Sequence, residues 1–168
     1  MTPNQVTWIP NYPVWQSPYA GNVTRFASPP TTLVIHSGAT LPSVAEYLRD
    51  NCQADGRSVA AHFAWSNTLS CYVQMLPLLR EGWHAGGCKI NGQRANGCSI
   101  GIEMSGPWDQ DPRDRYELSQ LLVLTSDLCD AIPTLRSWVR HSDIKATKRD
   151  PGPGFDAKWL DERLVWAG

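Results

Sequence analysis

Apolar runs of strand length alternate along this chain with apolar positions at helical spacing. The run TTLVIH, residues 31–36, is apolar and β-branched and is followed by turn residues, so we expect a buried strand that ends at His36. Ser43 and Glu46 then have the spacing of a capping box, and apolar residues follow at helical intervals. These signals predict a helix from about residue 43 to residue 51.

The middle of the chain contains two strand-like runs and a glycine-rich segment. Residues 58–66 and 70–76 are separated by a short polar turn, which predicts a β-hairpin. Residues 79–97 contain five glycines and show little periodicity, so we expect a long surface loop there. Because long ordered loops usually serve a function, this loop is a candidate part of a site.

The second half of the chain repeats the pattern of strands and helices. Residues 98–104 predict another strand. Asp111, followed by a proline, predicts the start of the longest helix, whose apolar face continues to about residue 131. Residues 137–140 predict a short strand, and residues 155–166 predict a terminal helix.

This alternation predicts a single α/β domain in which helices flank a mixed β-sheet. The length of 168 residues is that of one domain and is sufficient to bury a core. Residues 1–30 contain six prolines among aromatic residues. Because each proline removes a backbone donor and disfavours helix before it, we expect an extended N-terminal arm packed on a domain formed by residues 31–168.

Charge and hydropathy exclude several classes of partner. The net charge of −1 and the isoelectric point near 6.4 give no overall field for a polyanion, so we expect no nucleic-acid partner. No apolar run reaches the roughly 18 residues of a membrane span, and residues 1–30 lack the basic start and apolar segment of a signal peptide. We therefore expect no membrane insertion, and the sequence shows no export signal. We also expect the protein to be a monomer.

The five cysteines have no C-x-x-C spacing, which argues against a cysteine-based zinc site and a complete disulfide framework. Cys88 and Cys98 flank a loop rich in glycine and asparagine. Whether they form a disulfide stays open at this point, because the compartment is unknown. We expect the other three cysteines to be small, buried apolar side chains.

Three residues far apart in the sequence form a candidate metal site. His36 ends the first strand, His141 follows residues 137–140, and Asp150 lies in a segment long enough to turn back toward His141. Imidazole nitrogen and carboxylate oxygen are ligands of catalytic zinc, which takes three protein groups and keeps a fourth position open for water. We therefore predict Zn²⁺ bound by His36, His141 and Asp150.

Four motifs in a fixed order carry a resemblance to a known family. They are LVIHSGAT around His36, EGWHAGG around His84, NGCSIGIEMSG around Glu103 and HSDIKATKRDPGPGFD from His141 onward. Together they resemble the motifs of the zinc-dependent N-acetylmuramoyl-L-alanine amidases that are related to peptidoglycan recognition proteins. The resemblance implies the same α/β fold and hydrolysis of the amide bond between N-acetylmuramic acid and L-alanine in peptidoglycan.

The resemblance also implies roles for two residues near the metal. It assigns proton transfer to Glu103, and burial near the end of an apolar strand would raise the pKa of this carboxyl. It assigns stabilisation of the oxyanion to Lys148, worth about 3 kcal/mol if the lysine acts like a single oxyanion-hole donor. The segment from His141 to Asp150 is one residue shorter than the commonest family form, so Arg149 stays open as the alternative to Lys148.

Further candidates for contact with the substrate are His84, Trp83, His62 and Arg149. We place His84 at the substrate groove, because it lies in the glycine-rich segment. Trp83 could instead anchor that segment, and His62 could instead be a structural residue or lie behind a metal ligand.

The sequence therefore predicts a zinc amidase that acts on peptidoglycan or muropeptides, with a phage-type cell-wall lysin as the first hypothesis. Such a lysin would stay in the host cytoplasm until it is released to the cell wall. A cytoplasmic amidase that recycles soluble anhydromuropeptides fits the missing export signal equally well. The third alternative is a recognition module that binds muropeptides without cleavage, and the complete set of three metal ligands argues against it.

Overall fold

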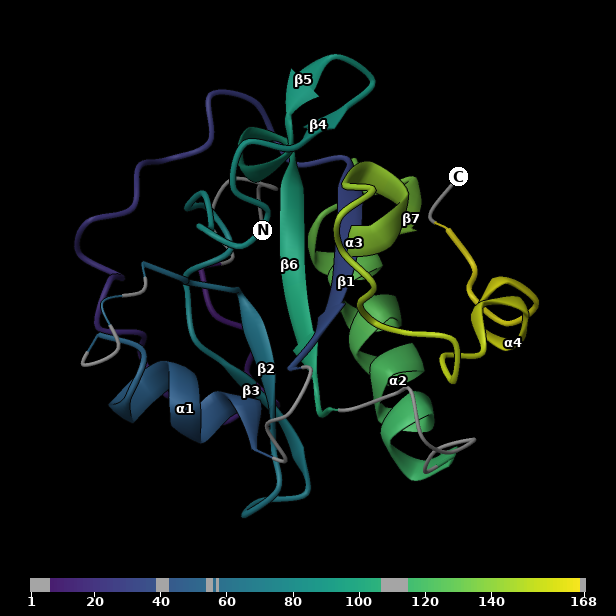
Figure 1. Ribbon diagram of the computed structural model, residues 1–168, viewed down its shortest axis with the longest axis horizontal. Helices are drawn as coiled ribbons and strands as arrows, with labels where there is room; N and C mark the ends of the chain where they lie inside the picture. The colour runs from purple at the N-terminus through teal and green to yellow at the C-terminus, as the bar shows by residue number, and fades with distance from the viewer. Residues whose placement is uncertain (1–6, 39–42, 54–55, 57, 107–114, 167–168) are drawn as a thin grey trace.

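A five-stranded mixed β-sheet forms the centre of the protein (Figure 1). This computed structural model describes residues 7–38, 43–53, 56, 58–106 and 115–166, and the strand order is β3-β2-β6-β1-β7. The bounds are Thr32–Ser37 for β1, Phe63–Ser66 for β2, Cys71–Gln74 for β3, Ser99–Met104 for β6 and Ser137–Arg140 for β7. Strand β3 is antiparallel to β2, and the other pairs are parallel. The predicted α/β fold with a mixed sheet is confirmed.

The helices and a small second sheet complete the described structure. The helix bounds are Val44–Asp50 for α1, Arg115–Ala131 for α2, His141–Ile144 for α3 and Ala157–Asp161 for α4. The second sheet pairs β4 with β5, followed by a 3₁₀ turn, with bounds Lys89–Ile90, Gln93–Arg94 and Ala95–Gly97. Within the described ranges, no helix is long and apolar enough to cross a membrane.

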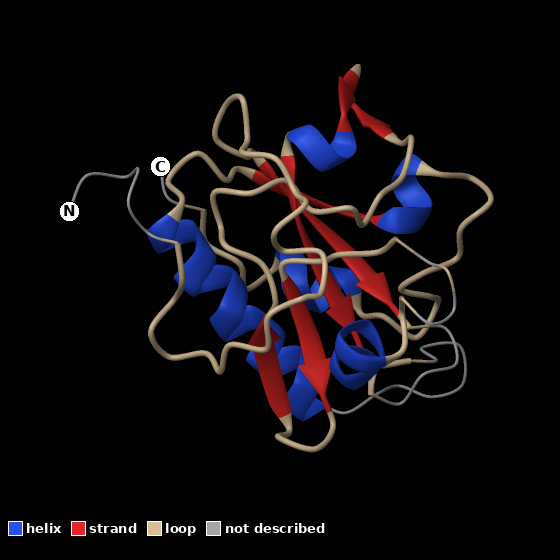
Figure 2. Ribbon diagram, turned by 90° about the vertical axis from the view of Figure 1, so that its left-hand side faces the viewer, coloured by secondary structure: helices blue, strands red, loops and turns tan. Residues whose placement is uncertain are grey.

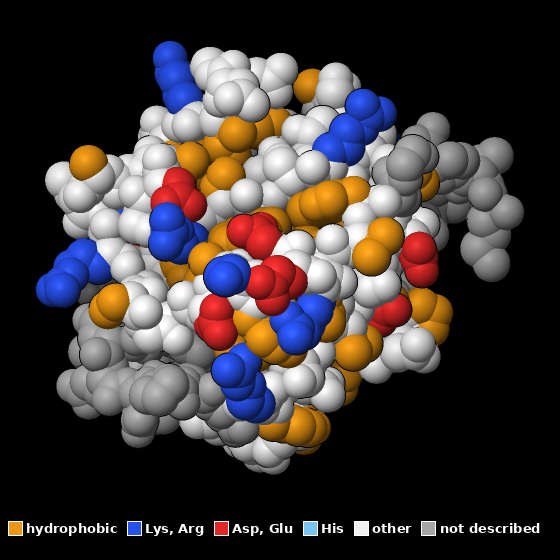
Figure 3. Space-filling model, turned by 90° about the vertical axis from the view of Figure 1, so that its right-hand side faces the viewer, with side chains coloured by type: hydrophobic (Ala, Val, Ile, Leu, Met, Phe, Trp, Pro, Cys, Tyr) orange, Lys and Arg blue, Asp and Glu red, His pale blue; other side chains and the backbone are white. Residues whose placement is uncertain are grey.

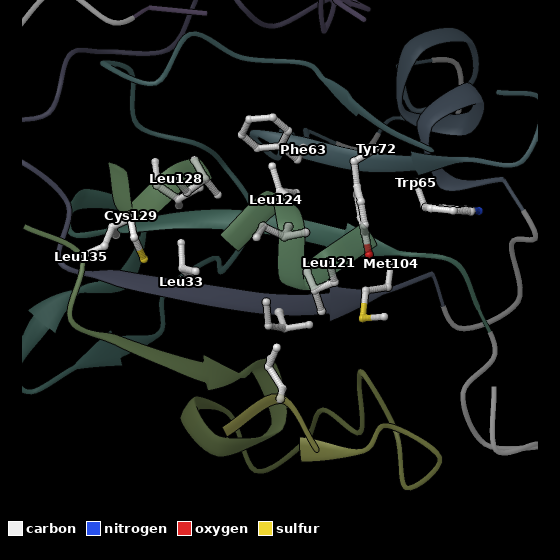
Figure 4. Packing of buried hydrophobic residues seen from close by; sticks show 14 of the residues in the cluster. Leu33, Phe63, Trp65, Tyr72, Met104, Leu121, Leu124, Leu128, Cys129 and Leu135 are labelled. Carbon is white, nitrogen blue, oxygen red and sulfur yellow. The ribbon is translucent and has the colours of Figure 1, made fainter. Parts of the chain in front are cut away.

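Side chains of the central strands alternate between two faces. Helices lie on either side of the strands (Figure 2). Helix α2 covers one face, where its residues Leu121, Leu124 and Leu128 pack with Leu33 of β1 and Met104 of β6 (Figure 4). Helix α1 packs on the opposite side, where it contacts β2 and β6. The alternation follows from the two-residue repeat of a strand and leaves every second position of β1 and β6 for the face opposite α2.

Both predicted helices before residue 132 are present. Helix α1 begins directly after Ser43, but the predicted capping box is wrong, because the Ser43 hydroxyl bonds to the Glu46 carboxylate and to no backbone amide of the helix. The Glu46 carboxylate instead accepts a hydrogen bond of 2.7 Å from Ser66, which ties α1 to β2. Helix α2 ends at Ala131 as predicted, and its predicted start at Asp111 lies outside the described residues.

Two predictions from the sequence are wrong, one for a surface loop and one for the length of the terminal helix. Residues 79–97 are not a surface loop, because many of them are buried and β4, β5 and a 3₁₀ turn occupy the second half. Backbone hydrogen bonds of 2.8 and 3.1 Å pair Trp83 with Ala60 and hold the first half against the chain before β2. A terminal helix was predicted for residues 155–166, but α4 is shorter and ends at Asp161. Leu164, which lies beyond the end of α4, is nevertheless buried as predicted.

The N-terminal segment from residue 7 lies along the β3 edge of the sheet. The fully buried Gln74 side chain accepts a hydrogen bond from the Ile9 amide at 2.8 Å and donates to the Thr7 carbonyl at 3.1 Å. The Trp15 amide donates to the Gln74 carbonyl at 3.0 Å. These bonds satisfy the polar groups of the edge strand and attach the segment to the domain.

None of the five cysteines forms a disulfide in this structure, so Cys88 and Cys98 are not bridged. Both are buried, and the Cys98 thiol contacts the carbonyl oxygen of Ala95 at 3.7 Å. Cys52 and Cys129 are also buried, whereas Cys71 at the start of β3 is partly exposed. Most of these thiols therefore pack as small, buried apolar side chains, as expected from the sequence.

Candidate active site

Three ligand atoms, from β1, α3 and the loop after α3, meet at one point. His36 Nδ1 lies 3.0 Å from His141 Nδ1 and 3.4 Å from Asp150 Oδ2. His141 Nδ1 lies 2.9 Å from the same carboxylate oxygen. Both histidines are buried, and the Asp150 side chain is partly exposed, so the cluster faces solvent on the Asp150 side. The structure thus brings together the three residues predicted as metal ligands.

The cluster fits a small cation in tetrahedral coordination. Bonds of about 2.0–2.2 Å to zinc would place neighbouring ligand atoms about 3.3–3.6 Å apart, close to the separations of 2.9 to 3.4 Å found here. A carboxylate has only acceptor atoms, and a neutral imidazole has one lone pair. When each imidazole carries its proton on the other nitrogen, His36, His141 and Asp150 present three electron-pair donors to one point, which a cation would satisfy together.

The parallel pairing of β1 and β7 brings the two histidines together. Thr32 lies opposite Ser137 and the register continues along both strands, so His36 at the end of β1 and His141 directly after β7 meet at the same edge of the sheet. Ligand sites at the carboxyl ends of parallel strands are typical of α/β proteins. The Ser142 amide donates to the Asp150 carbonyl at 3.0 Å, which closes the intervening loop and returns Asp150 to His141.

The surroundings keep two of the ligands in their metal-binding forms. Burial lowers the pKa of His36 to about 4, although the hydrogen bond with Asp150 opposes this. Burial by itself would raise the pKa of Asp150, but the contacts with His141 and His36 outweigh it and hold that pKa well below its usual range. At neutral pH the imidazole of His36 is therefore neutral and the carboxyl of Asp150 is ionised, as metal binding requires.

Glu103 lies beside the ligand cluster. It pairs in register with His36 across the parallel strands β1 and β6, which lie about 4.8 Å apart, so both side chains point to the same face. Burial and, to a smaller extent, the negative charge of Asp150 raise the pKa of Glu103 to about 8, against the opposing positive charge of Lys148. A carboxyl group that exchanges its proton near neutral pH thus stands next to the cluster without belonging to it.

Lys148 and Arg149 are exposed on the loop between α3 and Asp150. The positive charge of Lys148 lowers the pKa of both His36 and Glu103, so this lysine is within electrostatic reach of the site. Arg149 is not among the charges that act on either group in the described structure. This difference favours Lys148 over Arg149 as the cation beside the reacting atoms.

The face of the molecule around α3 and α4 carries charges of both signs side by side (Figure 3). Arg140 and Asp143 form an ion pair of 2.8 Å at the start of α3, and Arg163 contacts Glu162 at 3.3 Å after α4. The mixture agrees with the net charge of −1. This face therefore offers no surface of a single sign to a polyanion.

His62 is fully buried, and both of its ring nitrogens are occupied. Its Nε2 lies 2.7 Å from the Arg80 carbonyl oxygen, which can only accept, so Nε2 carries the proton. Its Nδ1 accepts from the Gly101 amide at 3.1 Å. The structure therefore gives His62 a structural position, the alternative left open by the sequence, and no ring nitrogen for a substrate.

His84 and Trp83 do not face a groove as expected from the sequence. His84 is 7% exposed and lies behind His36, with its Nδ1 2.9 Å from His36 Nε2. Trp83 is half-buried and its ring packs against Tyr19 at a centroid distance of 5.5 Å. The prediction assumed that both residues lie on a surface loop. It is wrong because much of this segment is buried.

Two polar residues near His84 were missed in the sequence. Asn96 Oδ1 accepts hydrogen bonds from the backbone amides of His84 and Ala85, at 3.3 and 2.8 Å. Ser99 Oγ lies 3.5 Å from His84 Nε2. A signal existed for Ser99, because it precedes Glu103 by four residues on β6 and so shares its face of the sheet.

A comparison with protein families matches residues 26–153 to N-acetylmuramoyl-L-alanine amidase, the Amidase_2 family. The chain belongs to this family. The matched range includes His36, Glu103, His141 and Asp150, and the family resemblance carried by the four sequence motifs is confirmed. No curated protein sequence was found to match the chain.

Solved structures of amidases have the same fold as this family member. The crystal structure of a selenomethionine AmpD derivative has a TM-score of 0.73 and 24% identity, covering 94% of this chain and 97% of AmpD. The endolysin amidase LysCS from Clostridium intestinale has a TM-score of 0.73 and 17% identity, covering 93% of this chain and 96% of LysCS. AmiD from E. coli, solved with the substrate anhydro-N-acetylmuramic acid-L-Ala-D-γ-Glu-L-Lys, has a TM-score of 0.68 and 25% identity, covering 83% of this chain and 59% of AmiD.

Proposed function

We propose that this chain hydrolyses the amide bond between N-acetylmuramic acid and L-alanine in peptidoglycan, with Zn²⁺ held by His36, His141 and Asp150. The observation that carries the proposal is the convergence of three ligand atoms, no more than 3.4 Å apart, beside the carboxyl of Glu103. Membership in the amidase family supports the class of reaction. The chemistry of the three ligands supports zinc as the ion.

A bound zinc ion would lower the pKa of a water molecule to about 7 and polarise the carbonyl of the scissile amide. Glu103 accepts a proton from the attacking water at its carboxylate and returns a proton to the leaving nitrogen of L-alanine. Lys148, at the exposed rim, stabilises the carbonyl oxygen as it gains negative charge. Placement on β1 and β6 holds His36 and Glu103 on interior strands of the sheet.

As the biological setting we propose a phage-type lysin that acts as a monomer on cell-wall peptidoglycan after its release from the host cytoplasm. A recycling amidase is the second candidate, because AmiD, at 25% identity, was solved with a small anhydromuropeptide as its substrate. The two candidates share the bond that is cleaved and differ in the size of the substrate. Comparison of intact sacculi with soluble fragments therefore separates them.

The proposal is tested by incubating the zinc-loaded protein with purified sacculi and with a soluble anhydromuropeptide, followed by mass analysis of the products. We expect stem peptides that begin with a free L-alanine amine, lost with a chelator and restored by zinc. Glu162→Gln is the control, because it changes an exposed carboxylate beyond α4. Cleavage of sacculi supports the lysin, and cleavage of the fragment alone supports recycling. Binding to sacculi without any cleavage would overturn the amidase proposal.

A further inference from the structure

The second ring nitrogen of His36 is hydrogen-bonded to another histidine. While His36 Nδ1 faces the ligand cluster, its Nε2 lies 2.9 Å from His84 Nδ1. Two imidazole nitrogens share a hydrogen bond only when one carries a proton and the other has a lone pair. The direction of this bond therefore decides whether Nδ1 of a neutral His36 is free to bind a metal.

The direction follows from the groups behind His84. Ser99 Oγ lies 2.6 Å from the Ala95 carbonyl oxygen, which can only accept, so the Ser99 hydroxyl donates its single proton there. His84 Nε2 lies 3.5 Å from the same Ser99 oxygen, which has lone pairs left to accept, so His84 carries its proton on Nε2. His84 Nδ1 then has the lone pair and accepts from His36 Nε2. The single N–H of a neutral His36 is therefore on Nε2, on the side of the ring away from the ligand cluster.

Two glycines make the space in which the His84 ring lies. A Cβ atom on Gly101 of β6 would come within 2.6 Å of ring atoms Cδ2 and Nδ1, and one on Gly82 would come within 2.9 Å of Cδ2. Both separations are shorter than side-chain contacts in folded proteins allow. Asn96 holds the backbone amide of His84 at 3.3 Å. The ring is therefore fixed in position by the backbone of β6 and by Asn96, as expected for a residue that orients another.

The other histidine of the cluster has a much weaker contact on its outer side. His141 Nε2 faces the Cys88 Sγ at 4.0 Å, and a thiol sulfur is a weak acceptor. His141 is instead placed by its position at the start of α3 and by the loop that returns to Asp150. The hydrogen-bonded chain that selects a tautomer thus acts on His36, and Cys88 offers a matched site for a control.

We propose that His84 is a positioning residue that holds His36 in the tautomer with an unprotonated Nδ1, through the hydrogen-bonded chain from His36 to His84, Ser99 and the Ala95 carbonyl. The proposal rests on the metal site of the proposed function. Outer partners of this kind orient a metal-binding histidine and increase its basicity as a ligand. In this role His84 acts through His36 and does not contact the substrate.

The test reads the protonation of each ring nitrogen by ¹⁵N NMR in the metal-free protein. We expect the proton on Nε2 of both His36 and His84 in the wild type. His84→Leu removes the acceptor, so the proton of His36 should redistribute to Nδ1, which faces Asp150. The zinc dissociation constant, measured by competition with a chelator, should then rise roughly 10–100-fold. His84→Asn offers a side-chain oxygen near the place of Nδ1 and should restore most of the affinity.

Cys88→Ala is the matched control, because it alters the outer contact of His141 and should leave the tautomer of His36 unchanged. A wild-type His84 with its proton on Nδ1 overturns the proposal, even if His84→Leu does not fold. A folded His84→Leu variant with unchanged zinc affinity and an unchanged His36 tautomer overturns it as well. Neither readout needs turnover, so failure to cleave peptidoglycan would overturn the proposed function and leave the result on His84 standing.

Discussion

His36 and Glu103 lie side by side on neighbouring parallel strands, one as a candidate metal ligand and the other as the candidate group for proton transfer. Strands β1 and β6 are interior strands of the sheet, and helix α2 packs on their other face. Movement of either residue would therefore disturb a close-packed core. The separation of the two side chains is set by the backbone hydrogen bonds of the sheet, which gives the site a fixed geometry before substrate arrives.

Glu103→Gln should abolish most turnover and leave the metal in place. The amide keeps the shape of the side chain but cannot accept a proton from water, so we expect the turnover number to fall roughly 10²–10⁴-fold. Zinc content should remain one ion per chain, because Glu103 is not in the ligand cluster. Turnover on a muropeptide and elemental analysis of the purified variant measure the two effects. Full activity would remove Glu103 from its assigned role, and Glu162→Gln serves as the control.

Zinc should lower the pKa of Glu103. In the metal-free protein, burial and the charge of Asp150 raise that pKa to about 8, against the opposing charge of Lys148. A divalent cation at the neighbouring cluster favours the ionised carboxylate, so the titration should move to lower pH when zinc is added. Carboxyl ¹³C NMR, with the signal assigned through Glu103→Gln, follows this change. A pKa that stays or rises on zinc binding would place the ion away from His36.

The three candidate metal ligands were predictable because each lies in a segment with a clear local pattern. The apolar run before His36 predicts a strand in any context, and His141 and Asp150 belong to one short segment. Their meeting point then follows from parallel pairing of β1 with β7. Sequence alone thus predicted the ligand types and their order along the chain, and the contact between them came from the sheet.

The position of His84 was not predictable from local pattern. Its burial depends on Gly82 and Gly101, which lie close to the ring only after β6 and the segment before β4 come together. Glycines in a polar segment predict a loop when they are considered one segment at a time. The same limit applies to the terminal helix, because Leu164 is buried by packing even though α4 ends at Asp161.

Lys148→Ala should reduce turnover far more than Arg149→Ala does. The charge of Lys148 acts on both His36 and Glu103, so under the proposed mechanism it is within electrostatic reach of the oxygen that gains negative charge. Loss of one such donor costs about 3 kcal/mol, or roughly 10²–10³-fold in turnover. Both residues are exposed, so the stability of the two variants should stay close to that of the wild type. If Arg149→Ala lost more turnover than Lys148→Ala, Arg149 would be the residue that stabilises the oxyanion.

Asp150→Ala should release the metal. The variant removes one of three ligand atoms and the only carboxylate among them, so the zinc dissociation constant should rise by more than the roughly 100-fold that loss of an outer partner causes. Chelator competition measures the constant, and Asp130→Asn, an exposed carboxylate on α2, is the control. Zinc retained at one ion per chain in Asp150→Ala would remove Asp150 from the ligand set.

His62 should make the protein less stable in acid. Burial lowers its pKa from the ordinary 6.5 to about 4 in the folded protein, against the opposing hydrogen bond to the Arg80 carbonyl. As pH falls below 6.5 the unfolded chain takes up a proton that folded His62 does not, so this contribution to stability is complete above about pH 6.5 and is lost toward pH 4. The total for this group is about 3 kcal/mol, of which about 2 kcal/mol falls between pH 7.5 and pH 5. His62→Gln keeps a donor for Arg80 and removes the titration, so urea unfolding of the metal-free proteins at these two pH values should show a smaller difference in the variant. An equal difference in both proteins would mean that folding does not shift the pKa of His62.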